Sequence, residues 1–159
     1  MEWYEDGPAL PVEFARKSSD GRITLVLLTE GPAAQLLWSV MQVTSAEEAR
    51  RNLAAREKCG EGSIGYWPSE GGCFEHSDLI GSWATSKGIV GVVWTALPPK
   101  FDSSQSLASA NEIVSYLRNL AEPTLSLARE YVRKTPPQIR TPYRAAIERE
   151  LEWTAISST

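Results

Sequence analysis

The chain has few of the side chains that metal and redox centres use. Its 159 residues include two cysteines, Cys59 and Cys73, and a single histidine, His76. Metal sites are usually built from several such ligands at short spacings. We therefore expect no metal and no cofactor. The cysteines are expected to be reduced thiols, and the alternatives are a disulfide between them or a nucleophilic cysteine paired with His76.

Positive charge and long apolar runs are also scarce. The net charge is −4, and the longest basic run is Arg50-Arg51. The chain therefore lacks the cluster of positive charge that would bind nucleic acid or an anionic membrane. No apolar run approaches the roughly 20 residues that cross a bilayer. Residues 1–6 are acidic where a signal peptide would be basic. We expect a cytoplasmic protein with no nucleic-acid or membrane partner.

The size and composition predict one domain. A chain of 159 residues with 42% hydrophobic content can bury a sizeable core without disulfides. We expect a single domain over residues 1–159. Within it, residues 1–97 form a β-rich core that contains a helix at 45–58, and residues 98–159 form a helical extension.

Period-two alternation and apolar runs predict the strands. Residues 10–15 alternate in polarity, and turn residues at 18–21 lead into a second alternating segment at 22–28, which indicates a hairpin. Further strands are predicted at 34–43, apolar on both faces, and at 63–67 and 88–97. The polar, glycine-rich residues 68–87 are expected to form a long loop.

Capping signatures, and a proline pair at 136–137 that ends one segment, predict four helices. Ser45 with Glu48, and Ser109 with Glu112, have the spacing of a capping box. Thr141 followed by Pro142 is typical of a helix start. The predicted helices span residues 45–58, 109–120, 123–133 and 141–151.

Glu57 continues the apolar stripe of its predicted helix. The stripe is Ala46, Ala49 and Leu53, and Glu57 occupies its next position. A carboxylate aimed at the interior is desolvated and lies at the negative end of the helix dipole, and both effects disfavour its charged form. General acids and bases working near neutral pH need such an environment. The alternative is that the helix frays near Gly60 and Glu57 turns to solvent.

Other polar and aromatic residues have simpler interpretations. Glu13 alternates with apolar neighbours, so we expect it on the solvent face of its strand. Arg140 and Arg144 flank a helix start, where the dipole disfavours cations, and this makes them candidate anion or partner contacts. Three tryptophans on predicted strands are expected in the core: Trp38, Trp67 and Trp94.

Two segments carry a resemblance to a known family. The hairpin LPVEFARKSSDGRITLVL is followed by a strand, a short helix and a second strand in AQLLWSVMQVTSAEEARRNLAAREKCGEGSIGYW. Over residues 7–97, this order resembles the gamma-glutamylcyclotransferase-like superfamily. Glu57 and Tyr66 fall where that family has a glutamate ending the helix and a tyrosine on the next strand.

The resemblance implies a fold and an activity. The fold would be α+β, a small mixed, partly closed sheet or barrel with one core helix, here with a C-terminal helical extension. The activity would be intramolecular acyl transfer on a small gamma-glutamyl amide, releasing 5-oxoproline. Glu57 would be the general acid and base, and Tyr66 would bind and orient the substrate.

The chain departs from the family at its start. The family carries a glycine-containing loop after its first strand, but here the chain begins at Met1–Tyr4, where that loop should be complete. Either the chain is a fragment of a longer product or its pocket is incomplete. A missing first strand would leave a sheet edge unpaired, through which the chain could form a homo-oligomer. The competing interpretations are a non-catalytic binding protein on the same scaffold and an unrelated α+β domain.

Overall fold

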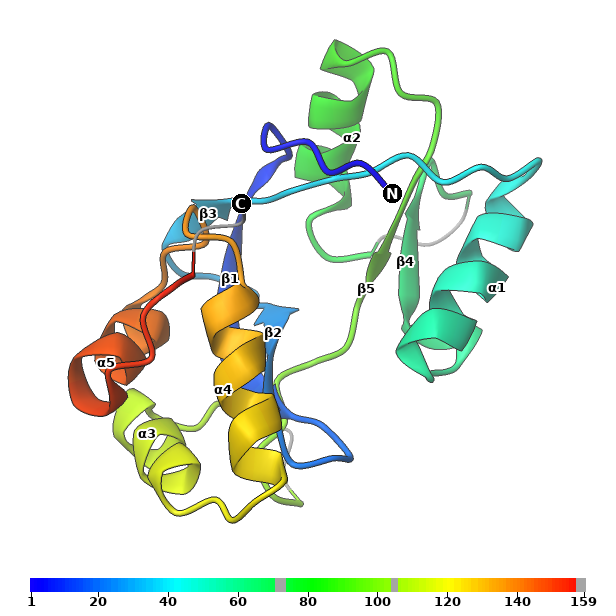
Figure 1. Cartoon of the computed structure of the whole chain (residues 1–159). Helices are drawn as coiled ribbons and strands as arrows, with labels where there is room; N and C mark the ends of the chain where they lie inside the picture. Colours follow the sequence, from blue (N-terminus) through cyan, green and yellow to red (C-terminus); the bar gives the residue numbers. More distant parts are fainter. Residues whose placement is uncertain (71–73, 104–105, 157–159) are drawn as a thin grey trace. The chain divides into compact units, whose positions relative to one another are not determined.

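A computed structural model describes residues 1–70, 74–103 and 106–156 (Figure 1). In these residues the chain is α+β, with five α-helices and two small antiparallel sheets, which confirms the predicted class. The chain divides into two compact units. Unit 1 comprises Met1–Leu10 and Gln35–Leu97, and unit 2 comprises Pro11–Ala34 and Pro98–Thr159. Each unit has its own core and is described by itself. The prediction of a single domain stays a prediction.

The predicted hairpin is present and belongs to a three-stranded sheet. Strands β1 (Ala9–Lys17) and β2 (Ile23–Leu27) pair antiparallel, and β3 (Ala33–Gln35) lies on the other side of β1, giving the order β2-β1-β3. The register shifts between Phe14 and Arg16, as at a β-bulge. Side chains on both faces of β1 are buried.

The three predicted C-terminal helices are confirmed in unit 2. They are α3 (Ala110–Arg118), α4 (Thr124–Lys134) and α5 (Pro142–Leu151). Ser109 and Glu112 form the predicted capping box at the start of α3. Thr141 caps α5 by accepting a hydrogen bond from the Arg144 main-chain N–H at 3.1 Å.

The core of unit 2 joins the hairpin to these helices. Its fully buried side chains come from β1, β2 and all three helices, and they include Phe14, Ile23, Ile113, Leu117, Val132 and Ile147. Burial of such side chains is the main stabilising contribution to a domain of this size.

Unit 1 is built on a two-stranded sheet. The strands predicted at 63–67 and 88–97 are present as β4 (Ile64–Trp67) and β5 (Val92–Thr95), and the structure pairs them antiparallel. Helix α1 (Ala46–Glu57) covers the face that carries Ile64, where Leu53 and Ala54 pack. Helix α2 (Ser77–Ser86) packs on the opposite face, where its Gly81 meets the indole of Trp67.

The predictions for two segments are wrong. The strand expected at 34–43 is limited to β3, after which residues 36–38 pair with the N-terminal segment. The loop expected at 68–87 contains α2, and its residues 71–73 lie outside the described part of the chain. A Cβ atom at Gly81 would lie 2.3 Å from Trp67 Nε1, so the helix needs a glycine for this close approach. That glycine contributes to the loop-like composition of the segment.

The sheet does not close in the described residues. The two sheets have three and two strands, so the predicted barrel is not confirmed. No helix in ranges 1–70, 74–103 and 106–156 has the length and apolar character that spanning a membrane requires.

Candidate functional site

Glu57 is not aimed at the interior of unit 1. Its side chain is 37% exposed, and its carboxylate forms an ion pair with Arg56 at 3.0 Å. The expectation of an inward-facing carboxylate is therefore wrong, and the alternative that Glu57 turns to solvent is correct.

The end of α1 explains why Glu57 leaves the stripe. Lys58 adopts the left-handed conformation with φ 53°, and its N–H donates to the carbonyl of Ala55 at 3.3 Å. The N–H of Cys59 donates to the carbonyl of Ala54 at 3.0 Å, which completes a Schellman motif. In this motif the residue after the left-handed one folds back on the helix. Cys59 accordingly packs in the same core cluster as Ala54, in the place that the stripe assigned to Glu57.

Tyr66 faces α1 but meets a different residue. The guanidinium of Arg50 lies 4.4 Å from the centroid of the Tyr66 ring, a cation–π contact. Arg50 precedes Glu57 by two helical turns, which is roughly 10 Å along the helix axis. The Tyr66 ring also packs edge-on against Phe74, with centroids 5.2 Å apart. The structure therefore places Tyr66 beside Arg50 and Phe74, and does not bring it together with Glu57.

The most buried carboxylate of unit 2 is Glu13, which is only 3% exposed. It accepts hydrogen bonds from the Phe14 N–H at 2.9 Å, the Thr141 hydroxyl at 2.6 Å and the Tyr143 N–H at 3.2 Å. Burial raises the pKa of the Glu13 carboxyl, and these hydrogen bonds only partly offset the effect. The expectation that Glu13 lies on a solvent face is wrong, because the start of α5 covers that face of β1.

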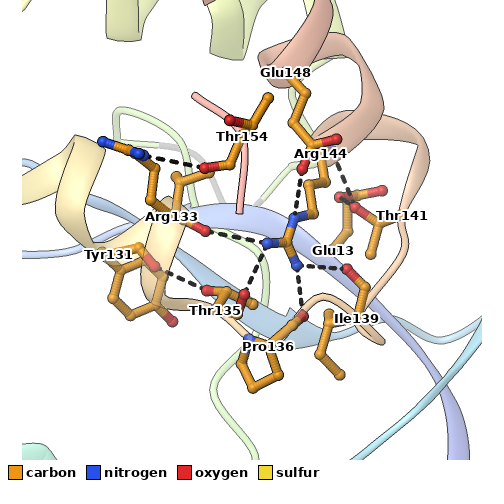
Figure 2. Close-up of polar contacts among 11 residues, drawn as sticks. Glu13, Tyr131, Arg133, Thr135, Pro136, Ile139, Thr141, Arg144, Glu148 and Thr154 are labelled. Atoms are coloured by element: carbon orange, nitrogen blue, oxygen red, sulfur yellow. Dashed lines mark hydrogen bonds and ion pairs between the residues drawn. The ribbon is translucent and has the colours of Figure 1, made fainter. Parts of the chain in front are cut away.

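Arg144 is the buried cation of the same region. Figure 2 shows its guanidinium surrounded by main-chain carbonyl oxygens from the end of α4 and the turn that follows. The carbonyls of Thr135 and Pro136 accept at 2.7 Å, and that of Ile139 at 2.9 Å. Its Nε also pairs with Glu148 at 3.1 Å.

This buried network is structural. Carbonyls at a helix C-terminus lack partners within the helix, and Arg144 supplies donors to them. Glu13 supplies acceptors to the N-terminus of α5, where the helix dipole favours a negative charge. The donors of Arg144 are directed at the protein itself, which does not support Arg144 as a candidate anion or partner contact.

The third candidate is built on three aromatic side chains of unit 1 that contact one another, Tyr4, Trp38 and Trp83. The exposed Trp3 directly precedes Tyr4 in the chain, and we call these four residues the aromatic surface. The rings of Tyr4 and Trp38 stack with centroids 4.6 Å apart, and Trp83 meets Trp38 edge-on at 5.5 Å. Trp3 is 52% exposed and Tyr4 37%. The expectation that Trp38 lies on a core strand is wrong, since it pairs with the N-terminal segment and is half-buried.

Main-chain pairing explains the stacked rings. The Tyr4 N–H donates to the Trp38 carbonyl at 2.8 Å, and the Trp38 N–H donates back at 3.0 Å. Residues paired in this way carry their side chains next to each other on one face. Gly7 fixes the same segment, because a Cβ atom there would lie 2.4 Å from the Leu36 carbonyl oxygen that its N–H binds.

Asp6 holds the two indoles in place. Its carboxylate accepts a hydrogen bond from Trp38 Nε1 at 2.8 Å, and its main-chain carbonyl accepts one from Trp83 Nε1 at 2.9 Å. The carboxylate also binds Lys87. The hydrogen bonds from Lys87 and Trp38 hold the pKa of Asp6 below its ordinary value. Sequence reasoning missed this surface, although the density of aromatic and acidic residues at the start of the chain could have indicated it.

The described residues provide neither a disulfide nor a metal-binding site. Cys59 is a half-buried thiol without a disulfide, and Cys73 lies outside the described residues. Within the ranges the structure covers, no group of three or more histidine, cysteine or acidic side chains could hold a metal ion.

No family model, no curated protein and no solved structure matches the chain. The comparisons therefore provide no link to the gamma-glutamylcyclotransferase-like superfamily, and that resemblance stays a prediction.

Proposed function

We propose that the protein is a non-catalytic binding protein, and that the aromatic surface of unit 1 is its contact with a partner. The observation that carries the proposal is the exposure of the consecutive residues Trp3 and Tyr4, 52% and 37%, together with the stacking of Tyr4 on Trp38, one of two indoles held by Asp6. Exposed apolar patches on soluble proteins often mark interaction sites. Tryptophan and tyrosine are also the side chains most enriched where interfaces gain their binding energy.

The rigidity of this surface adds support. Stacking, main-chain pairing and the hydrogen bonds to Asp6 order the rings of Tyr4, Trp38 and Trp83 before any partner arrives. A surface that is ordered in advance loses less conformational entropy on binding. The environment of Glu57 also favours a binding role, because this residue is exposed and ion-paired with Arg56.

Affinity capture with matched variants tests the proposal. The immobilised protein is exposed to an extract of its source cells, in parallel with Trp3→Ala and Leu107→Ala. Leu107 is the control because it is as exposed as Trp3, 51% against 52%, and lies in unit 2. We expect a partner that the wild type and Leu107→Ala retain and Trp3→Ala loses. If all three chains capture the same proteins in the same amounts, the aromatic surface is not the contact.

The amide-cyclase activity remains the competing prediction. It requires Glu57 as the acid and base, Tyr66 near the substrate, and a partly closed barrel around a small gamma-glutamyl amide. Its test is the release of 5-oxoproline from gamma-glutamyl amides by the wild type and by Glu57→Gln. Turnover that this variant abolishes would contradict the binding-protein proposal. We expect no turnover by either chain.

A further inference from the structure

Carboxylates border the aromatic surface. Glu2, Glu5 and Asp6 belong to the same exposed segment as Trp3 and Tyr4. The carboxylate of Glu2 accepts a hydrogen bond from the Tyr4 hydroxyl at 3.2 Å. The negative charge of Glu2 raises the pKa of the Tyr4 phenol, and this hydrogen bond raises it further by a smaller amount. The Glu2 carboxylate is therefore close enough to the Tyr4 side chain to interact with it electrostatically.

Two neighbouring cationic side chains are already engaged in ion pairs. Lys87 binds Asp6, and Arg56, which approaches Met1, pairs with Glu57. Among the described side chains, Glu2 takes part in no ion pair. The surface consequently combines electron-rich rings with the negative charge of Glu2, which neither Lys87 nor Arg56 neutralises.

Both features attract the same kind of group. The face of a tryptophan or tyrosine ring attracts an ammonium or guanidinium group within about 6 Å of its centroid. The chain makes such contacts internally, since Arg50 lies 4.4 Å from the Tyr66 centroid and Lys17 lies 4.7 Å from the Tyr116 centroid. Carboxylates beside the ring add Coulomb attraction for a cation and repel an anion.

We propose that the aromatic surface binds a basic segment of a partner protein. A lysine or arginine side chain of the partner lies against the rings of Trp3 and Tyr4, and its charge faces Glu2. This inference rests on the proposed function and adds the chemistry of the partner. An acidic partner is disfavoured because its charges would meet the same carboxylates.

Peptides of defined charge test the inference. The probes are oligolysine, oligoglutamate and an uncharged serine–glycine peptide of the same length, each titrated into ¹⁵N-labelled protein. The signals followed are the indole N–H resonances of Trp3, Trp38 and Trp83, assigned by single substitutions. We expect oligolysine to shift these resonances and the other two peptides to leave them in place. Added salt should weaken the effect, because exposed charges are screened.

Charge variants make the test specific. Replacing Glu2 by glutamine should weaken oligolysine binding by about threefold. Trp3→Ala should weaken it by about threefold as well, through the lost cation–π contact. Glu30→Gln is the matched control, because Glu30 is also an exposed carboxylate but lies in unit 2, and it should leave the binding unchanged.

The outcomes separate this inference from the proposed function. If the uncharged or acidic peptide shifts the same resonances as strongly, the surface binds without selecting for positive charge and the inference fails. If no peptide shifts them, the inference also fails. In either case the Trp3-dependent capture described above decides independently whether the surface is a contact.

Discussion

At the residue scale, the two buried charges of unit 2 do not face each other but lie at opposite ends of neighbouring helices. Arg144 donates to carbonyls at the end of α4, and Glu13 accepts from N–H and hydroxyl groups at the start of α5. Thr141 links them, since its hydroxyl donates to Glu13 and accepts from the Arg144 N–H. Each charge therefore fixes the short connection between α4 and α5.

Removing the Arg144 guanidinium should destabilise unit 2. Arg144→Met keeps most of the apolar stem but leaves the carbonyls of Thr135, Pro136 and Ile139 without their donors. We expect a loss of about 3 kcal/mol in the free energy of unfolding, measured by urea denaturation. Arg149→Ala, at an exposed position of the same helix, is the control and should change stability by less than about 0.5 kcal/mol. Equal effects of the two variants would contradict the role of Arg144.

Glu13 should make stability fall as pH rises above its ordinary pKa of 4.5. Its pKa is raised in the folded protein, so the folded state holds this proton more tightly than the unfolded state does. The associated stabilisation is complete below pH 4.5 and is lost as pH rises through the raised value. Carboxyls with lowered pKa values, such as Asp20 and Glu112, act with the opposite sign and at lower pH.

The measurement is the urea midpoint as a function of pH for the wild type and Glu13→Gln. We expect a downward slope above pH 4.5 in the wild type and a flatter profile in the variant, whatever its overall stability. Glu30→Gln, which removes an exposed carboxylate, should keep the wild-type slope. Parallel profiles for the wild type and Glu13→Gln would show that Glu13 is not the titrating group.

At the element scale, the end of α1 decides where Glu57 goes. Lys58 occupies the left-handed position, which glycine adopts at less cost. Lys58→Gly should therefore stabilise unit 1 by about 0.5–1 kcal/mol. Ala55→Gly, at an exposed position inside the same helix, should destabilise it by about 1 kcal/mol. Thermal unfolding followed by circular dichroism compares the two, and a loss of stability with Lys58→Gly would contradict the motif.

Most elements could be predicted from local sequence signals. The hairpin followed from alternation and turn residues, and α3 and α5 followed from their caps. The failures came from contacts distant in sequence. Gly81 is required by Trp67, and nothing within α2 itself announces that contact. Residues 36–38 are apolar because they pair and stack with the N-terminal segment, and not because they form a central strand.

The candidate site was predicted less well, for the same reason. Helical periodicity placed Glu57 on the buried stripe, but periodicity holds only while the helix continues. The chain reverses at Lys58, and Cys59 takes the buried place. Similarly, strand alternation at Glu13 could not reveal that α5 covers its face, because the covering residues lie more than a hundred positions later.

At the scale of the whole molecule, the two-stranded sheet of unit 1 has an edge, along β5, through which copies of the chain would associate. In β4–β5 the Ala96 N–H donates to the Ser63 carbonyl at 2.8 Å, and the antiparallel alternation then directs the N–H groups of Val93 and Thr95 away from β4. Residues 88–97 contain no charged side chain to protect this edge. The predicted homo-oligomer would use such an edge.

A charge beside β5 should therefore reduce self-association. Val90 is 91% exposed, so Val90→Lys adds a charge without disturbing the core. Sedimentation velocity over a wide range of protein concentration should show association of the wild type and less of it in this variant. Leu107→Lys, an equivalent change in unit 2, should associate as the wild type does. A wild type that stays monomeric at every concentration would contradict self-association through this edge.

The aromatic surface gives the molecule its proposed role, and one affinity tests it most directly. The measurement is the dissociation constant of the captured partner for the wild type, Trp3→Ala and Leu107→Ala, by isothermal titration calorimetry. Truncating an exposed tryptophan at the centre of a contact should weaken binding by about tenfold or more. Leu107→Ala, by contrast, should bind the partner as the wild type does. Equal affinities for all three chains would contradict the assignment of Trp3 and its neighbours as the contact surface.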